Sequence, residues 1–302
     1  MIELNLIADV AVPAIVWLLM LVVGLELTLA DFRRVLLYPK AVGVATVGQL
    51  LLLPLIAAGL IWTLQPAPYL VAGMVLLAAC PGGAISNFYT YLARANVALS
   101  VTLTAVSSLL ALLTMPLLMS AGFALFLDRH EVIEVPVGRM ALKLAIMLAV
   151  PIAAGMGLRR WKEPLVERHA QGLRWLSLAA LGLLIALILF AQRESIMNEA
   201  GPVTLAAALF SQLDMAAGWG VGRLAGLNVE DRFTLLFEFA ARNLAIAAVI
   251  GIMVLGRVEY LLFATLFFLT QVPIVLLVVV IYARRSARQR PSPRHSAVGQ
   301  TR

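Results

Sequence analysis

Charged residues are scarce in this chain. Only 13% of its 302 residues are Asp, Glu, Lys or Arg, whereas 62% are hydrophobic, and the mean hydropathy is +0.97. Soluble globular domains carry about 25% charged residues. The composition therefore excludes an ordinary soluble domain and predicts an all-α polytopic membrane protein.

Cysteine is almost absent as well. The single cysteine, Cys80, excludes an intramolecular disulfide framework, and no CxxC pair or Cys/His cluster indicates a metal centre. The sequence also lacks the HExxH and GxSxG motifs and any nucleophile–base pairing. We therefore predict a protein that is not an enzyme and has no organic cofactor.

Apolar runs of about 20 residues or slightly more recur along the chain, which is the length of a membrane-spanning helix. Met1–Asp9 contains two acidic residues and no basic one, so we read the first run as a membrane helix rather than a signal peptide. Nine spans are predicted, at residues 8–29, 40–64, 69–93, 97–124, 137–158, 173–192, 201–225, 233–256 and 259–283.

The basic residues sort according to this topology. Seventeen of the 23 Lys and Arg residues fall on one side of the nine spans or in the tail, and four fall on the other side. Positive charge favours the cytoplasmic side. We therefore predict an inner plasma membrane protein with its N-terminus outside, a basic, disordered cytoplasmic tail at 284–302, contact with the lipid bilayer, and no nucleic-acid partner.

The stretch Met74–Ser86, MVLLAACPGGAIS, interrupts the third span. Pro81 cannot donate a backbone hydrogen bond, and we expect Gly82 and Gly83 to supply backbone shapes that other residues disfavour. Transporters place ion sites at such breaks, near polar side chains like those of Ser86 and Asn87. A proline kink with satisfied small polar residues is the alternative.

A second polar group, FEFAARN, lies inside the eighth span. Glu238 and Arg242 are four residues apart and share a face if the helix is intact. Ionisable residues this deep in a membrane are costly and usually functional, although a buried ion pair that fixes helix packing is possible. The third and eighth spans run in opposite directions and contain Asn87 and Asn243 respectively. This arrangement predicts an inverted repeat, in which spans one to four match spans six to nine.

The stretch CPGGAISNFYTYLARANVALSVTLTAVSSLLA, with GLELTLADFRRVLLYPKAV and QLLLLPLIA before it, resembles the bile acid:sodium symporter family. The resemblance extends from about Leu18 to Tyr282. It implies a single transmembrane domain over residues 1–283, with two discontinuous helices that cross. A core domain would comprise spans within 40–124 and 201–283, and a panel domain those within 8–29 and 137–192.

The resemblance also implies the ion sites. The first sodium site would comprise the oxygen-bearing residues Ser86, Asn87, Ser100, Thr104 and Glu238. A second site would use Gln49, Glu238 and the position of Arg242, where the family has glutamine. Because arginine cannot bind a cation, we expect this site to be degenerate and at most one sodium ion to be coupled. We also expect the guanidinium to donate to the Glu238 carboxylate.

The family's substrate-lining asparagine corresponds to Asn243, and we predict that Asn87, Arg242 and Gln271 also contact the substrate. Asp214 is a further departure, and its carboxylate is either a counter-charge for Arg242 or an interhelical hydrogen-bonding group. The resemblance thus implies sodium-coupled symport, by alternating access, of a small carboxylate or bile-acid-like organic anion. A sodium-independent facilitator, a proton-coupled carrier using Asp214 or Glu238, and a non-transporting membrane receptor are the alternatives.

Overall fold

The computed structural model describes residues 10–127 and 137–289, and these are helical nearly throughout. Expectations for 1–9 and 290–302 concern residues outside this range. The α-helices are α2 (Val12–Glu26), α3 (Leu29–Arg33), α4 (Pro39–Leu64), α5 (Pro68–Ala79), α6 (Ile85–Ala93), α7 (Val97–Phe126), α8 (Val137–Leu144), α9 (Val150–Trp161), α10 (Glu163–Arg168), α11 (Ala170–Ala191), α12 (Arg193–Leu224), α13 (Val229–Ala240), α14 (Leu244–Ala248) and α15 (Leu261–Gln289). Two π-helices follow α8 and α14, at Ala145–Ala149 and Val249–Val254.

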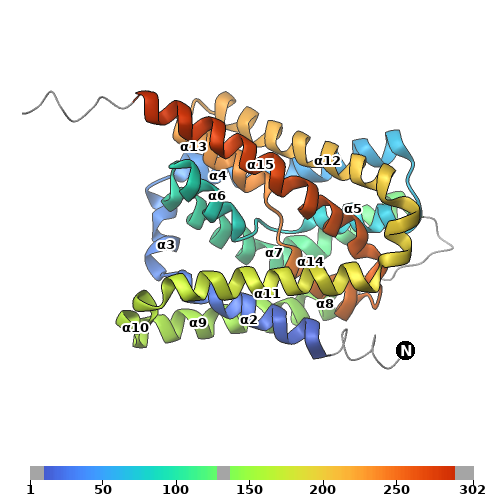
Figure 1. Cartoon of the computed structure of the whole chain (residues 1–302), viewed down its shortest axis with the longest axis horizontal. Coiled ribbons are helices and arrows are strands. Elements are labelled where there is room, and N and C mark those ends of the chain that lie inside the picture. The colour runs from blue at the N-terminus through green and yellow to red at the C-terminus, as the bar shows by residue number, and fades with distance from the viewer. Residues whose placement is uncertain (1–9, 128–136, 290–302) are drawn as a thin grey trace, which may run out of the picture.

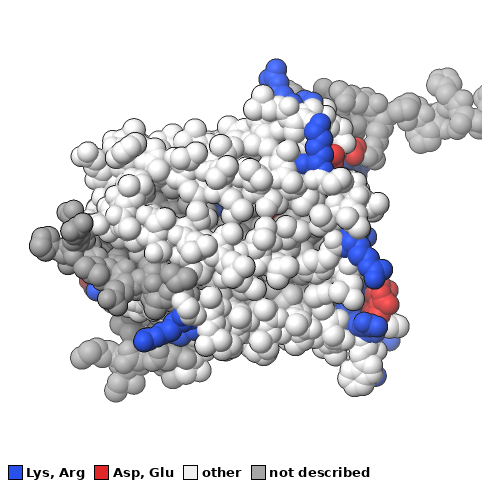
Figure 2. Space-filling view, turned by 180° about the vertical axis from the view of Figure 1, so that it is seen from behind, with Lys and Arg blue, Asp and Glu red and all other residues white. Residues whose placement is uncertain are grey.

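The chain is a multi-pass membrane protein. Five helical segments of the described chain are long and apolar enough to cross a bilayer. The bent pair Val12–Glu26 and Leu29–Leu36 makes a sixth if it is counted as one span. The remaining expected spans coincide with α12 and with two interrupted helices, so nine spans and the inverted repeat stay predictions. On the face in Figure 2, Lys and Arg gather near the two ends and leave an almost uncharged band between them.

The helices form two layers (Figure 1). In the lower layer α2 packs against α9 and α11, and in the upper layer α12 packs against α4, α13 and α15. The lower layer contains the segments assigned to the panel by resemblance. The helix α2 begins at one end of the bundle and α15 ends at the other, six residues beyond the expected end at 283.

The lower layer is held together by close backbone approach. A Cβ atom on Gly24 would lie 2.3 Å from the carbonyl oxygen of Ile152, and one on Gly155 would lie 2.3 Å from that of Leu21. Small residues at helix crossings allow such van der Waals contact in membranes. The crossing of α2 and α9 therefore depends on both glycines.

Gly155→Ala is expected to lower the thermal stability of the purified protein, because the added methyl group must push the two helices apart. Overpacking of this kind costs about 1–3 kcal/mol. Gly157→Ala on the same helix is the matched control, since a Cβ atom there meets nothing within 4 Å. Equal melting temperatures for the two variants would contradict the close crossing.

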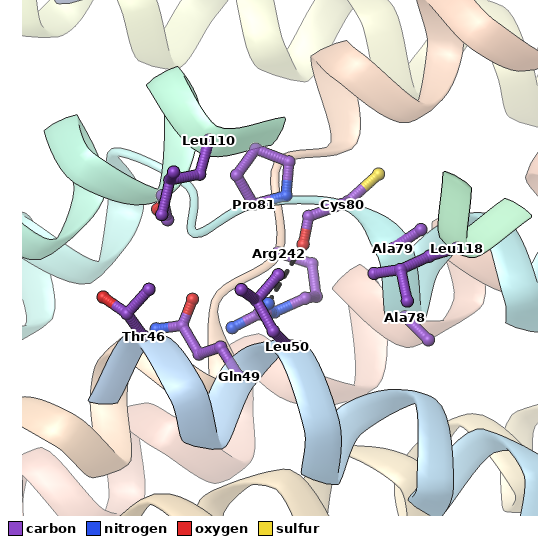
Figure 3. Close-up of a pocket in the computed structure, with 11 residues that line it drawn as sticks. Thr46, Gln49, Leu50, Ala78, Ala79, Cys80, Pro81, Leu110, Leu118 and Arg242 are labelled. Carbon is purple, nitrogen blue, oxygen red and sulfur yellow. Dashed lines mark hydrogen bonds between the residues drawn. The ribbon is translucent and has the colours of Figure 1, made fainter. Parts of the chain in front are cut away.

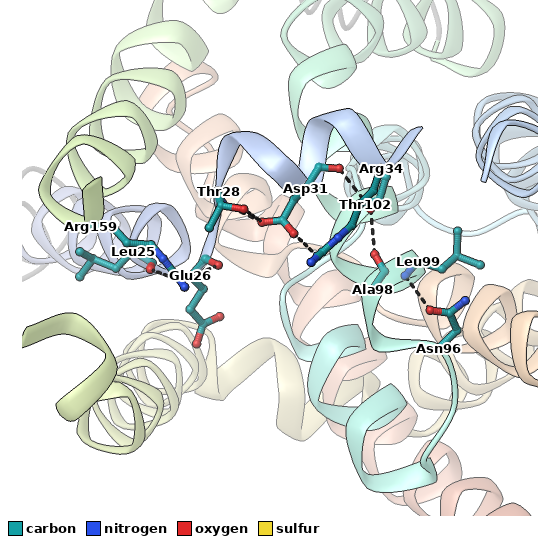
Figure 4. A network of polar contacts seen from close by, with 10 residues as sticks. All are labelled: Leu25, Glu26, Thr28, Asp31, Arg34, Asn96, Ala98, Leu99, Thr102 and Arg159. Carbon is teal, nitrogen blue, oxygen red and sulfur yellow. Dashed lines mark hydrogen bonds and ion pairs between the residues drawn. The ribbon is translucent and has the colours of Figure 1, made fainter. Parts of the chain in front are cut away.

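The layers are connected through the bend between α2 and α3 (Figure 4). Arg159 of α9 donates to the carbonyl oxygens of Leu25 and Glu26, at 3.0 and 3.2 Å, which fixes the end of α2. Beyond a 69° bend, the Thr102 hydroxyl of α7 donates to the carbonyl of Asp31, which holds α3 on the upper layer. The short turn between α2 and α3 therefore joins a helix of the lower layer to the upper layer.

Candidate functional site

The first helix break lies between α5 and α6. The helix α5 ends at Ala79 and Cys80 is extended, as expected for a residue that precedes a proline. The chain turns through Gly82 and Gly83 before α6 begins at Ile85. The predicted interruption at Pro81–Gly83 is therefore present.

The second break lies between α13 and α14. The helix α13 ends at Ala240, Ala241 is extended, and Asn243 caps α14 by accepting a hydrogen bond from the Ile246 amide at 3.2 Å. Arg242 consequently lies in extended chain. The condition under which Glu238 and Arg242 would share one helix face is not met, because the helix stops between them.

The two breaks cross and pair with each other. Gly82 and Arg242 form an antiparallel bridge. The Gly83 amide donates to the Ala241 carbonyl at 2.8 Å, and the Asn243 amide donates to the Pro81 carbonyl at 3.1 Å. Backbone groups within a bilayer must find partners inside the protein. Each interrupted helix satisfies the groups freed in the other.

The glycines at the crossing are required by space rather than by backbone shape. Neither Gly82 nor Gly83 has a positive φ, so our expectation of a special conformation is wrong. A Cβ atom on Gly83 would lie 2.9 Å from the main-chain oxygen of Arg242, and one on Gly82 would lie 2.1 Å from Oε1 of Glu238. The two segments can approach each other this closely only where the side chain is a hydrogen atom.

Glu238 lies at the centre of a buried cluster of oxygen atoms. The Ser86 hydroxyl donates to Oε2 at 2.6 Å, and the Thr104 hydroxyl donates to Oε1 at 3.0 Å. Ser100 lies 3.4 Å from both Oε2 and the Ser86 oxygen. The four side chains are at most 3% exposed. Because Ser100 and Thr104 occupy successive turns of α7, one helix presents two hydroxyls to one carboxylate.

The two asparagines lie close to the two breaks along the chain. Asn87 follows Ser86 on α6 and Asn243 follows the second break, and both are half-buried. The Asn87 side-chain oxygen is buried without a hydrogen-bond partner. A carboxylate, hydroxyls and an amide oxygen are the ligands that a hard cation prefers. The residues predicted for the first ion site are thus chemically suited to sodium.

We expected Arg242 to donate to the Glu238 carboxylate, but it does not. Its guanidinium donates to the main-chain oxygen of Glu238 at 2.7 Å and to that of Cys80 at 3.0 Å. Figure 3 shows the side chain directed from the break toward Gln49 of α4. Both residues line a pocket of about 20 Å³, which is room for about one water molecule.

Two further predicted residues are fully buried. Gln271 of α15 donates to the Tyr89 hydroxyl at 3.1 Å, so in this structure it is part of the helix packing. Asp214 of α12 is 0% exposed, and neither carboxylate oxygen has a hydrogen-bond partner. The interhelical hydrogen bond suggested as one role for Asp214 is therefore not formed.

The first two thirds of the chain carry a recognisable family signature. The chain matches the sequence model of the Sodium Bile acid symporter family over residues 13–199, which is more than half of its length. The chain belongs to the sodium bile acid symporter family. The resemblance seen in the PGG stretch is confirmed.

Three relatives illustrate the range of similar proteins. The chain is 29% identical over 232 residues to the probable sodium/metabolite cotransporter BASS1, chloroplastic, of Arabidopsis thaliana, which covers 77% of this chain and 56% of the plant protein. It is 25% identical over 234 residues to the uncharacterized sodium-dependent transporter YocS of Bacillus subtilis (strain 168), covering 78% and 71%. It is 26% identical over 227 residues to the P3 protein of Bos taurus, covering 74% and 46%. The chain thus spans about half the length of the plant and bovine relatives.

The sodium bile acid symporter match ends before the second break. Glu238, Arg242 and Asn243 lie beyond residue 199, so their place in the site rests on the geometry of the crossing.

Sequence reasoning missed several residues that support the crossing. The Ser107 hydroxyl accepts from the Gly82 amide at 3.3 Å and donates to the Thr104 carbonyl at 3.2 Å. At the end of the bundle, Asn96 caps α7 and donates to Asp231 at 2.8 Å, which joins α7 to α13. Asparagine before an apolar run is a helix-start signal and could have marked Asn96, Asn228 and Asn243.

Proposed function

We propose that this protein is a sodium-coupled symporter of an organic anion, either a small carboxylate or a bile-acid-like molecule. The observation that carries the proposal is the cluster of Ser86, Ser100, Thr104 and Glu238 beside two paired helix breaks. A sodium ion there would contact residues from α6, α7 and α13, and would therefore stabilise one arrangement of all three. Coupling requires such a difference in ion affinity between states.

The substrate would bind near Asn87 and Asn243. Both residues are half-buried, and the Asn87 amide oxygen lacks a partner. We place the transporter in the inner plasma membrane, with the basic tail in the cytoplasm. The two layers would correspond to core and panel domains that move relative to each other in alternating access.

Uptake into proteoliposomes tests the proposal. Candidate anions are first selected by thermal shift, using small carboxylates and sulfonated steroids with and without sodium. Uptake of the selected anion is then measured in sodium and in choline buffers of equal ionic strength. Sodium-dependent uptake supports symport. Equal uptake in both buffers would identify a facilitator, and dependence on a pH gradient alone would identify a proton-coupled carrier.

We expect at most one sodium ion per turnover. Arg242 occupies the carbonyl oxygens of Cys80 and Glu238, and its charge is fixed. At about 4 Å and an effective dielectric constant of about 20, two like charges repel by roughly 4 kcal/mol, or nearly three decades of affinity. A second ion beside Gln49 is therefore excluded.

The Hill coefficient and the charge moved per substrate measure this stoichiometry. In the wild type we expect one sodium ion, and in Arg242→Gln we expect a rise toward two because the amide restores an oxygen ligand. Two sodium ions in the wild type would contradict the role of Arg242.

A further inference from the structure

Asp214 makes none of the hydrogen bonds of the proposed sodium site. Its carboxylate is completely buried, and both oxygens lack hydrogen bonds. Arg242 has a complementary deficit, since its Nε atom is buried and unpartnered while its terminal nitrogens bind carbonyls. A buried carboxylate stays ionised only if an opposite charge compensates it, and otherwise it takes up a proton.

The packing of α12 against α13 brings the two charges into one region. The helices run antiparallel, with Gly222 against Arg232 and Gly218 against the Leu235 carbonyl. One turn further along α12, Asp214 is level with the end of α13, where the second break begins. Asp214 and Arg242 also lie within electrostatic range of each other.

Asp214 is separate from the oxygen cluster. The hydrogen bonds of Glu238 come from α6 and α7, and none reaches Asp214. Any effect of Asp214 on sodium must therefore pass through the electric field and through Arg242. This distinguishes it from an ion ligand.

We propose that Asp214 is a charge-balancing residue that cancels Arg242 and thereby sets the sodium affinity of the Glu238 cluster. Glu238 and Arg242 alone sum to zero charge, so the guanidinium offsets part of the attraction between the Glu238 carboxylate and a cation. With an ionised Asp214 the three residues carry one net negative charge, which matches one sodium ion. The inference rests on the proposed sodium site.

The test is a double-mutant cycle in which sodium affinity is measured by thermal shift at constant ionic strength. Asp214→Asn is expected to weaken sodium binding about tenfold, which corresponds to about 1.4 kcal/mol, because the substitution removes one negative charge from this region. In the Arg242→Gln background the same substitution should change the affinity less than twofold. A buried carboxylate without its partner takes up a proton, so it has no charge left to remove.

Two controls separate charge from packing. Ser211→Ala removes a buried, unpartnered hydroxyl one turn earlier on α12, and Glu167→Gln removes an exposed carboxylate on α10. Both should leave the sodium affinity unchanged. An Asp214→Asn effect of less than twofold would overturn the proposal, and so would an equal loss in both backgrounds.

The melting temperature in sodium-free buffer tests the pairing independently of sodium. Asp214→Asn should lower it in the wild type, where Arg242 is left unpaired, and should not lower it in Arg242→Gln. If the wild type binds no sodium, the proposed symport fails while this readout still decides whether Asp214 compensates Arg242. Additive melting shifts would overturn the pairing itself.

Discussion

Glu238→Gln is expected to abolish the stabilisation of the protein by sodium. The substitution keeps the shape of the side chain but removes the only ionised group in the oxygen cluster. A unit charge about 4 Å from the ion contributes roughly 4 kcal/mol at an effective dielectric constant of about 20, so the affinity should fall by nearly three decades. Ligand-induced stabilisation depends on the ratio of ligand concentration to dissociation constant and would then vanish at ordinary sodium concentrations.

The measurement compares melting temperatures in sodium chloride and choline chloride at equal ionic strength. Glu230→Gln is the matched control, because it removes an exposed carboxylate from the same helix. It should retain the sodium-induced shift. If Glu238→Gln retains the shift as well, sodium does not bind at this cluster.

Gly82→Ala, which adds a single methyl group, is also expected to impair sodium binding severely. The new Cβ atom would lie 2.1 Å from Oε1 of Glu238, which is held at 3.0 Å by Thr104. The carboxylate must leave its hydroxyl partners or the two breaks must separate. We expect a loss of at least about 100-fold in sodium affinity, equivalent to about 2.7 kcal/mol.

Comparison with other glycine variants separates this effect from general damage. Gly43→Ala on α4 meets nothing within 4 Å and should behave as the wild type. Gly83→Val presses on the main chain of Arg242 and should impair both transport and thermal stability. Normal sodium binding by Gly82→Ala would show that the carboxylate has room to move.

The sequence predicts the first break better than the second. Pro81 marks the end of α5, because a proline restricts the residue before it and lacks a donor. No proline or glycine lies between Ala240 and Asn243, so only the capping asparagine hints that α13 stops. Residue spacing alone therefore does not locate the break, and it directs the Arg242 guanidinium to the carboxylate of Glu238 rather than to its main-chain oxygen.

Contacts between residues far apart in the sequence are the second feature that the sequence alone does not predict. Ser86 and Glu238 are 152 positions apart, and their contact depends on how two breaks cross. The resemblance supplied this pair, whereas residue spacing did not. Likewise, the need for glycine at position 82 follows from a side chain on another helix.

The pairing of the two breaks has a consequence for how the chain enters the membrane. During synthesis the first interrupted helix emerges well before Ala241 and Asn243, whose backbone groups are its partners. Until then the Pro81 carbonyl and the Gly83 amide lack those bonds, and each unsatisfied group in a bilayer costs several kcal/mol. The first half of the protein must therefore remain sheltered or incompletely inserted until the second half arrives. The crossing is among the last parts of the fold to form, so biogenesis and site assembly end in the same step.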